Sequence, residues 1–373
     1  MLKIEYMHLQ SLSILDFKNI EQADFVFSEK LNCFLGDNGA GKTNLLDAIY
    51  YLSFTKGFFN SIDAQNIRHH REMFMLQGKY IRSDENETIS AGFKIGQKKQ
   101  IKRNRKLYKK LSDHIGLFPL VMISPSDISL ISGGSDERRK FMDGVISQFD
   151  RIYLDTLLRY NRTLLQRNNL LKQFFEKRFF DEDTLSVYDE QLAELAGVIH
   201  KKRELYVNEI TPVFQSFYTF VSGGNETVGL SYQSCMNEGD YSRQLLACRN
   251  RDRAAQHSTL GIHRDDLLLE LGDFPMKKIG SQGQQKTYLL ALKLAQFDYL
   301  KNASDIKPIL LLDDIFDKLD AKRVSKIIEL VTEARFGQIF ITDTDREHLA
   351  YILDKMNTEH LIFKIENGKI VGK

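Results

Sequence analysis

Two stretches of this 373-residue chain combine residue types and spacings that suit phosphate chemistry. The first, GDNGAGKT at residues 36–43, fits the pattern G-x-x-x-x-G-K-[ST] in full. Its glycines let the backbone curl until N–H groups face a phosphate, and the helix that follows adds positive polarity. Lys42 then reaches the β- and γ-phosphates, and Thr43 offers an oxygen to Mg²⁺. We therefore predict an ATP and Mg²⁺ site. Its predicted contacts are Gly36, Asp37, Asn38, Gly39, Ala40, Gly41, Lys42 and Thr43.

The second stretch, PILLLDDIFDKLD at residues 308–320, is an apolar strand that ends in two carboxylates. We expect Asp313, at the strand tip, to hold Mg²⁺ directly or through water. Asp314 would polarise the attacking water as a general base. Taken alone, the stretch also fits a buried strand that ends in an acidic turn. The phosphate loop upstream favours the catalytic interpretation.

A further helix start has anion-binding character. In GSQGQQK, residues 280–286, Ser281 is suited to an N-cap, and Gly283 allows close approach to a helix end of positive polarity. ISGGSDERRKF, residues 131–141, is closer in letters to the Leu-Ser-Gly-Gly signature of ABC-type ATPases. A turn before a helix begun by Asp136 is the better interpretation there. We therefore favour 280–286 as the signature segment, because a single helix separates it from the Asp313 strand. The alternative is that 280–286 is an ordinary capped helix start.

Hydrophobic periodicity indicates the elements that position these residues. Strands are expected within 1–35 and 73–123 and at 309–313 and 338–342, and helices at 42–54, 283–301 and 319–334. Residues 136–220 read as almost wholly helical, with a hairpin of 151–178 against 185–208. We expect an α/β ATPase domain built from both ends of the chain. The predicted domains are its N-terminal part at 1–124, a helical arm at 125–220, and its C-terminal part at 221–373.

Composition narrows the class of protein. The chain has 52 Lys and Arg against 50 Asp and Glu, so any nucleic-acid surface must be local. Three scattered cysteines, Cys33, Cys235 and Cys248, predict neither a disulfide framework nor a zinc site. The first residues lack the apolar run of a signal peptide, and no stretch is long and apolar enough to cross a membrane. We expect a cytoplasmic protein without a membrane partner.

The chain resembles the RecF family, ABC-type ATPases of bacterial recombinational repair that are related to the heads of SMC proteins. The resemblance covers nearly the whole length, and the paired His263-Arg264-Asp265-Asp266 element is quite specific. The matching stretches are LDFKNI (15–20), GDNGAGKTNLLDAIY (36–50), ISPSDISLISGGSDERRKFMD (123–143), LGIHRDDLLLEL (260–271), GSQGQQKTYLLALKLA (280–295), LLLDDIFDKLD (310–320) and IFITDTD (339–345).

The resemblance implies an ABC-type P-loop ATPase head with a helical insertion that forms a second lobe. It also implies a homodimer with ATP held between the phosphate loop of one subunit and the signature of the other. Ser281, Gln282 and Gly283 would then act in trans, and Asp320 would occupy the interface turn that links the two sites. Lys18 stands where relatives usually carry Arg near the phosphates, so it would supply a charge without a planar fork.

The chain departs from ABC transporters in three respects. Asp314 replaces their usual Glu, although Asp is common in the RecF family, and slow turnover is expected. Thr342 or Thr344 stands in place of the switch histidine. No transporter-type Q-loop glutamine is evident, and the region of Ser124–Asp127 is the candidate for that place.

The chain also differs from SMC proteins. SMC heads need far longer arms than the insertion at 125–220, and this difference favours a RecF-like protein over its longer relatives.

One run, Lys94–Lys110, holds nine basic residues and no acid. Such a density predicts salt-sensitive, sequence-neutral DNA binding, with a solvated hairpin as the alternative. Basic residues of the arm are an open option, namely Arg159, Arg162, Arg167 and Lys172. For His263 and Arg264, a structural network is favoured over a functional role. The predicted DNA contacts are Lys98, Lys99, Lys102, Arg103 and Arg105.

Family resemblance implies an ATP-gated protein that binds gapped or junction DNA and works with RecO and RecR to help load RecA onto single strands. Weak, DNA-stimulated hydrolysis would serve as a switch. Two other classes use the same loop. A transporter ATPase is disfavoured by the missing switch histidine and the helical insertion, and a metabolic phosphotransferase leaves the signature stretch unexplained.

Overall fold

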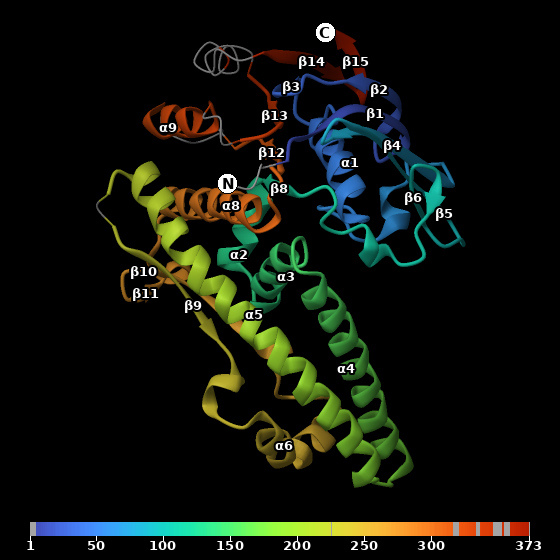
Figure 1. Ribbon diagram of the computed structural model, residues 1–373, viewed down its shortest axis with the longest axis vertical. Helices are drawn as coiled ribbons and strands as arrows, with labels where there is room; N and C mark the ends of the chain where they lie inside the picture. The colour runs from blue at the N-terminus through green and yellow to red at the C-terminus, as the bar shows by residue number, and fades with distance from the viewer. Residues whose placement is uncertain are drawn as a thin grey trace. The chain divides into compact units, whose positions relative to one another are not determined.

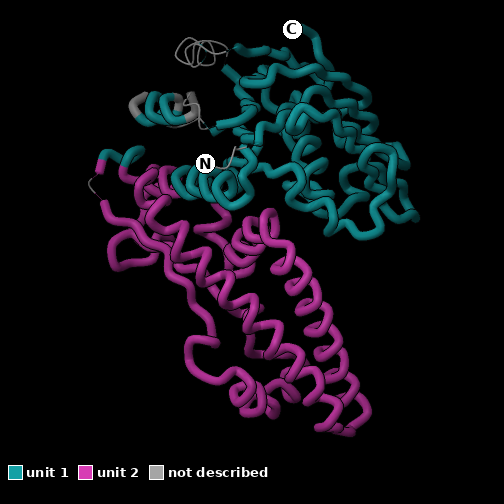
Figure 2. The backbone as a smooth tube through the Cα atoms, in the orientation of Figure 1, with its two compact units in different colours: residues 1–127, 220–223, 289–373 teal, residues 128–219, 224–288 magenta. Residues whose placement is uncertain are grey.

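The computed structural model describes residues 5–224, 226–315, 321–332, 336–345, 353 and 359–372. The chain divides into two compact units (Figure 2). The first unit comprises residues 1–127, 220–223 and 289–373, so both ends of the chain build it. The second comprises 128–219 and 224–288. None of the described helices is long and apolar enough to span a membrane.

One sheet of the first unit is antiparallel, with the order β2-β1-β4-β5-β6-β7. Burial alternates along β4, as expected for strands with one face against a core. The strands are β1 (Met7–Phe17), β2 (Ile20–Val26), β4 (Met73–Arg82), β5 (Glu85–Lys94), β6 (Gln100–Arg103) and β7 (Lys106–Leu107).

The other sheet has the order β15-β14-β3-β13-β12-β8, and it is parallel except for β15. All five residues of β12 and of β13 are buried, as in parallel strands covered on both faces. Asp313 pairs in register with Thr342, and Asp343 with Leu35. The carboxyl ends of β12, β13 and β3 therefore meet at one edge. The strands are β3 (Leu31–Leu35), β8 (Leu120–Ile123), β12 (Ile309–Asp313), β13 (Ile339–Asp343), β14 (His360–Glu366) and β15 (Lys369–Gly372).

Helix α1 (Lys42–Phe54) contacts strands of both sheets and is covered on most sides (Figure 1). Its apolar residues join one core with Phe17, Phe34, Phe74 and Phe340. Because α1 is fixed between the sheets, the loop before it is held at the shared strand edge. The unit also contains α9 (Ala321–Thr332), most of α8 (Gln282–Ser304), and the short 3-10 turns η1 (Asp63–Asn66), η2 (Leu111–Asp113) and most of η3 (Pro125–Ile128).

The second unit is largely helical, with a small antiparallel sheet β11-β10-β9. The predicted hairpin is present, but its second helix is longer than the expected 185–208. The buried stripe of that helix continues past Pro212 through Phe214 and Tyr218, so packing sustains it beyond the proline. The elements are α2 (Ser129–Ser132), α3 (Ser135–Ile146), α4 (Arg151–Lys177), α5 (Glu182–Ser222), α6 (Tyr241–Ala255), α7 (Met276–Ile279), β9 (Val228–Gln233), β10 (Asp266–Leu271), β11 (Phe274–Pro275), η4 (Cys235–Glu238) and η5 (Ile262–Arg264).

The boundary of the second unit differs from the expected one. Residues 224–288, expected in the C-terminal part of the ATPase domain, belong to the helical unit. The reason is local packing at the start of α8. The Tyr288 hydroxyl donates to Gly229 O at 2.6 Å, and its ring lies 4.6 Å from that of Phe214. The stretch 280–286 is therefore part of the second unit.

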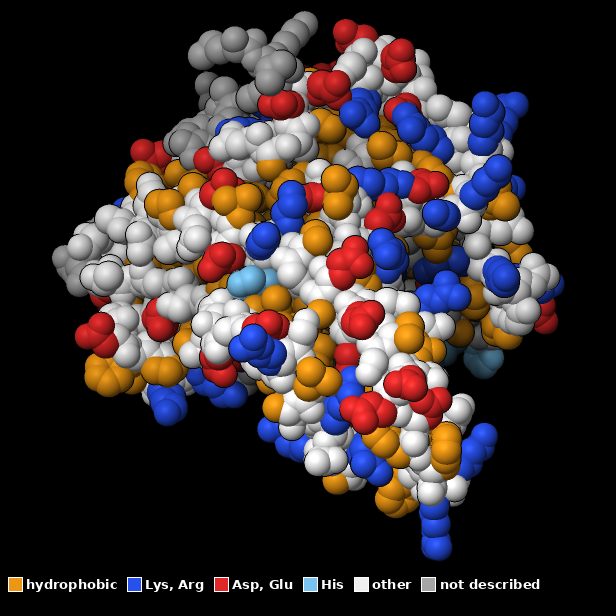
Figure 3. Space-filling model, turned by 60° about the horizontal axis from the view of Figure 1, so that its bottom comes forward, with side chains coloured by type: hydrophobic (Ala, Val, Ile, Leu, Met, Phe, Trp, Pro, Cys, Tyr) orange, Lys and Arg blue, Asp and Glu red, His pale blue; other side chains and the backbone are white. Residues whose placement is uncertain are grey.

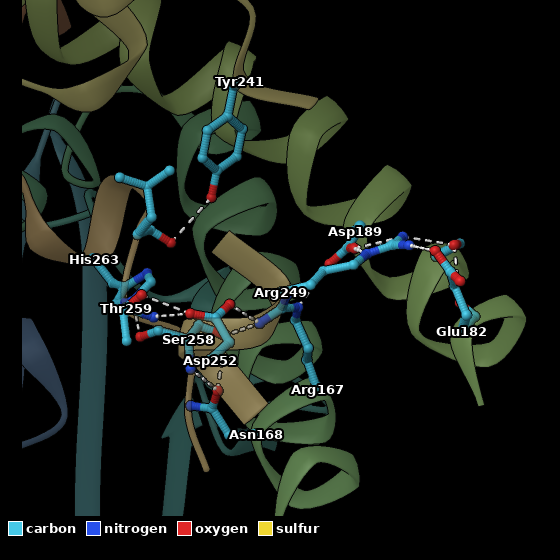
Figure 4. A network of polar contacts seen from close by, with 12 residues as sticks. Arg167, Asn168, Glu182, Asp189, Tyr241, Arg249, Asp252, Ser258, Thr259 and His263 are labelled. Atoms are coloured by element: carbon cyan, nitrogen blue, oxygen red, sulfur yellow. Dashed lines mark hydrogen bonds and ion pairs between the residues drawn. The ribbon is translucent and has the colours of Figure 1, made fainter. Parts of the chain in front are cut away.

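A buried polar network joins α4, α5 and α6 (Figure 4). Arg167, which is fully buried, donates to Asp189 Oδ1 and Asp252 Oδ2, both at 2.7 Å. Arg249 binds the other Asp189 oxygen at 3.0 Å and Glu182 at 2.6 Å. Buried charges need such partners to offset their desolvation. Arg167, one of the arm residues considered for DNA binding, is therefore not available for it.

Candidate nucleotide-binding site

The loop at residues 36–43 connects β3 to α1, and its glycines are required by geometry. A Cβ on Gly36 would lie 2.3 Å from Ile365 O, so no side chain fits there. Gly39 and Gly41 have φ values of 81° and 110°, a region that L-residues with side chains rarely adopt. Gly41 is the N-cap of α1 and no side chain caps it. The first N–H groups of α1 are therefore left for a ligand, as the motif predicts.

Lys42 lies back across this loop. Its Nζ donates to Gly36 O at 2.7 Å and to Asp37 O at 3.1 Å. The ammonium group is thus held over the curve that the backbone amides form. That position suits a positive charge that binds the terminal phosphates of a nucleotide.

Asn19 also contacts the loop, a role that was not predicted from the sequence. Its Nδ2 donates to Gly39 O at 3.4 Å, and its Oδ1 accepts from Asn44 Nδ2 at 2.8 Å. The turn between β1 and β2 therefore lies against the phosphate loop. The only sequence signal was its position beside Lys18 in the matching stretch LDFKNI.

Lys18 lies beside Asp47 instead of a residue of the loop. Its ammonium group forms an ion pair with the Asp47 carboxylate, which is fully buried on α1. Asp47 Oδ1 also accepts from Phe58 N at 2.6 Å. Burial raises the pKa of Asp47, and the charge of Lys18 opposes that effect. In this arrangement the charge of Lys18 is partnered within the protein.

Asp313 is the centre of a cluster of oxygen donors. Its Oδ1 accepts from Thr43 Oγ1 at 2.8 Å and from Thr342 Oγ1 at 3.0 Å, and its Oδ2 accepts from Ser124 Oγ at 3.3 Å. Burial raises the pKa of the Asp313 carboxyl, and the hydroxyl bonds act in the opposite direction. One carboxylate with neighbouring hydroxyls is a donor set that suits Mg²⁺ shared with phosphates. Thr43 and Asp313 would hold that ion.

Asp314 follows directly in a left-handed conformation, with φ at 44°. Its N–H donates to Thr342 Oγ1 at 2.9 Å, and its Oδ1 lies 3.4 Å from the same oxygen. Thr342 is fully buried and joins both carboxylates, whereas Thr344 is exposed. Of the two threonines considered for the switch position, the structure brings Thr342 to the site. Asp320 lies outside the described residues.

The stretch at 280–286 forms a capped helix start. Ser281 N donates to Gln284 Oε1 at 2.7 Å, and Gln284 N donates to Ser281 Oγ at 3.3 Å, which is a capping box. The Gln284 amide also donates to Glu226 Oε1 at 2.6 Å. Ser281 and Gln282 are exposed. The cap therefore fixes the helix start while leaving both residues accessible.

The competing stretch at 131–141 is a turn between helices. Ser132 ends α2 and its hydroxyl donates to Ile128 O at 3.1 Å. Gly133 and Gly134 connect this helix to α3, for which Gly134 is the N-cap. Helix α3 begins at Ser135, one residue before the predicted start. This geometry agrees with the turn interpretation.

The basic run at 94–110 begins at the last residue of β5 and contains β6 and β7, which pair as an antiparallel hairpin. Lys and Arg side chains gather on the same side of the space-filling view (Figure 3). Two of the five predicted DNA contacts are engaged within the first unit. Lys99 Nζ donates to Thr55 O at 2.7 Å and lies 3.1 Å from Asp63 Oδ2. Arg103 forms a bidentate pair with the buried Glu87. Lys98, Lys102 and Arg105 form no ion pair within the described part of the chain.

His263 belongs to an internal network, in agreement with the favoured interpretation. Its Nδ1 lies 2.9 Å from Tyr160 Oη and its Nε2 lies 3.1 Å from Ser258 O. Burial lowers the pKa of His263 to about 4, so the ring is neutral at neutral pH. Arg264, next along the chain, is exposed.

Comparison with known proteins agrees with this geometry. Residues 8–370 match the model of the "RecF/RecN/SMC N terminal domain" family. A relative from Phocaeicola vulgatus, "DNA replication and repair protein RecF", is 55% identical over 369 residues, covering 98% of this chain and 99% of the relative. The chain belongs to the RecF family. A member of the same name from Flavobacterium johnsoniae is 49% identical over 359 residues, covering 96% of this chain and all of the relative.

Solved structures extend the comparison. A RecF family structure described as "RecF-ATP in RecFOR pathway" is 31% identical, with a TM-score of 0.88 and coverage of 98% of this chain and 97% of that chain. An SMC head bound to the C-winged helix domain of ScpA is 15% identical, with a TM-score of 0.59 and coverage of 98% and 97%. That likeness shows the fold alone. The predicted fold class, an ABC-type P-loop ATPase head with a helical insertion, is confirmed.

Proposed function

We propose that this RecF family chain is an ATP-driven DNA-binding dimer of recombinational repair, with Mg²⁺ as its metal. The observation that carries the proposal is the cluster at the end of β12. Thr43 and Asp313, which are 270 residues apart, come within 2.8 Å, directly below a glycine loop shaped for phosphates. This combination is the nucleotide and magnesium site of P-loop ATPases. The RecF-ATP structure named above supports ATP as the nucleotide.

The roles of the residues follow from their positions. Lys42 would neutralise charge on the terminal phosphates, and Thr43 with Asp313 would hold the metal ion. Asp314 would polarise the attacking water, with Thr342 holding its backbone in place. A shorter carboxylate than the usual Glu suits slow turnover, so hydrolysis would end a DNA-bound state and serve as a switch.

Dimerisation is proposed from the signature stretch. Its helix start has an exposed serine and a positive end, yet it belongs to a different compact unit from the phosphate loop. A site that needs both parts can be completed by a second subunit with twofold symmetry. Ser281, Gln282 and Gly283 would then contact the γ-phosphate bound by the partner. By family membership we further propose RecO and RecR as protein partners and the cytoplasm as the location.

The central test is DNA binding by gel shift with and without ATP and Mg²⁺, on duplex, single-stranded and gapped DNA. We expect ATP to strengthen binding at least about tenfold, because closure of the dimer would join two DNA-binding surfaces. Gapped DNA should be bound as well as or better than duplex. Binding that is absent, or unchanged by ATP, would contradict the proposal.

The basic hairpin gives a narrower prediction. Lys98→Glu with Arg105→Glu should weaken DNA binding and lower the slope of log K against log salt by about 1–2, since each lost phosphate contact removes about 0.9. These two side chains are exposed, whereas Lys99 and Arg103 hold internal ion pairs and should be left intact. A charge change at the exposed Lys201 on α5 is the control. An unchanged slope would assign the hairpin to ordinary solvated surface.

A further inference from the structure

Lys293 is a buried cation on α8, close to the proposed magnesium site. Its Nζ lies 2.8 Å from Asp127 Oδ1 and donates to Met122 O at 3.1 Å. Both side chains of the ion pair are only 7% exposed. No sequence pattern assigned a role to Lys293. Asp127 was considered only as part of the region 124–127, the candidate for the Q-loop.

Hydrogen bonds connect this pair to the carboxylate that would hold the metal. The second oxygen of Asp127, Oδ2, accepts from Ser124 N at 2.9 Å. The Ser124 hydroxyl in turn donates to Asp313 Oδ2 at 3.3 Å, while Thr43 binds Oδ1 of the same carboxylate. The order of contacts is therefore Lys293, Asp127, Ser124, Asp313.

Strand register explains why Ser124 reaches Asp313. Strand β8 runs parallel to β12, and Ile123 pairs with Leu312. One residue further along, Ser124 comes level with Asp313 at the carboxyl end of the sheet. The backbone must turn at this point into η3 (Pro125–Ile128). Asp127 closes that turn by accepting from Ser124 N, and Lys293 holds Asp127.

Stability alone is a poor reason for such a pair. Replacing a buried ion pair with well-packed apolar residues is often neutral or stabilising, because the desolvation of two charges is avoided. Here the pair lies two hydrogen bonds from a candidate metal ligand and fixes the direction of a hydroxyl toward it. Active-site groups need this kind of support because small displacements are costly to the reaction.

We propose that Lys293 and Asp127 are positioning residues of the magnesium site, which hold the turn after β8 so that the Ser124 hydroxyl faces Asp313. The inference rests on the proposed ATP hydrolysis. It also gives α8 a second role, since the helix that begins at Gln282 of the signature carries Lys293 further along.

The test compares Lys293→Met with Lys293→Arg, Ser124→Ala and the double variant Lys293→Met/Asp127→Leu. Binding of a fluorescent ATP analogue, ATP hydrolysis, the Mg²⁺ concentration for half-maximal hydrolysis and Tm are measured for each. Lys301→Met is the matched control. It removes a lysine from the same helix whose ion pair, within the described part of the chain, is with Asp298 at 2.8 Å, three residues earlier.

Lys293→Met should bind the analogue within about threefold of wild type but hydrolyse ATP about tenfold to a hundredfold more slowly. Its Mg²⁺ midpoint should rise several-fold, and Ser124→Ala should raise it in the same way. Lys293→Arg, which keeps the pair, should restore most activity. The double variant should regain the Tm that Lys293→Met loses. Its hydrolysis should stay low, because the turn after β8 has lost both Lys293 and the Asp127 carboxylate that accepts from Ser124 N.

Several results would overturn the inference while leaving the proposed function intact. These are hydrolysis by Lys293→Met within twofold of wild type, hydrolysis restored together with Tm in the double variant, or an unchanged Mg²⁺ midpoint in Ser124→Ala. The last variant removes a single oxygen, so it decides the matter even where Lys293→Met does not fold. A wild-type chain that neither binds nor hydrolyses ATP would instead contradict the proposed function itself.

Discussion

An equal mixture of Lys42→Ala and Ser281→Arg proteins should hydrolyse ATP at about a quarter of the wild-type rate, although each variant alone is almost inactive. In a twofold dimer, half of the molecules would be heterodimers with one of two sites intact, which gives about that fraction. The intact site takes Lys42 from one subunit and Ser281 from the other. Each single change should lower hydrolysis about a hundredfold or more, because a preorganised charge or donor at the phosphates is lost.

The positions of both residues make these substitutions selective. Among the described residues, Lys42 Nζ donates to two loop carbonyls, Gly36 O and Asp37 O, so its loss leaves no carboxylate without a partner there. Ser281 is exposed, so an arginine there adds bulk and charge at the helix start without entering the core. A mixture of Lys42→Ala with Lys42→Ala/Ser281→Arg is the control, since no intact site can form in it. Equal rates in the two mixtures would rule out sharing of the site between subunits.

Contiguous motifs allowed much of the site to be predicted. The phosphate loop follows from the spacing of its glycines, and Asp313 from a wholly apolar strand that ends in carboxylates. The alternation of strands and helices also placed β12 at its observed bounds and β13 within one residue. Such features depend on local chemistry, and local chemistry is readable from sequence.

Other contacts depend on register and packing between distant segments. The pairs Lys18–Asp47 and Lys293–Asp127 join residues that no local pattern connects, so they emerge only once the sheets and helices are assembled. The boundary of the second unit differs from the predicted one for a similar reason. The contacts of Tyr288 with Gly229 and Phe214 tie the start of α8 to the helical unit.

Two features were readable but missed. The spacing Ser281-x-x-Gln284 is that of a capping box, which predicts a role for Gln284 in the cap. Arg167 lies on the same helical stripe as Tyr160, Leu171 and Phe174, all of them buried. That periodicity indicates an inward side chain, but a charge is usually read as solvated. Its carboxylate partners on α5 and α6 were the missing information.

Asp314→Asn should bind ATP but hydrolyse it about a hundredfold more slowly, so that the protein accumulates as an ATP-bound dimer. The amide cannot accept a proton from water, whereas the metal carboxylate of Asp313 is untouched. The fold should tolerate the change. Asparagine is among the residues best suited to φ near 44°, and the backbone N–H bond to Thr342 Oγ1 is independent of the side chain.

Size-exclusion chromatography with ATP and Mg²⁺ measures the outcome directly. Asp314→Asn should elute as a dimer with ATP and as a monomer without it, whereas Asp313→Asn, which weakens the metal site, should remain a monomer in both conditions. The two variants carry the same chemical change, Asp to Asn, at neighbouring positions. The contrast between them therefore separates binding of the nucleotide from its hydrolysis. If the Asp314→Asn protein stays monomeric in ATP, ATP binding does not drive dimerisation. Hydrolysis at the wild-type rate in this variant would exclude Asp314 as the general base. If the Asp314→Asn dimer is stable and also retains gapped DNA, slow ATP hydrolysis is linked to DNA release. Loss of the proton acceptor at position 314 would then be enough to keep the protein in its closed, DNA-bound state.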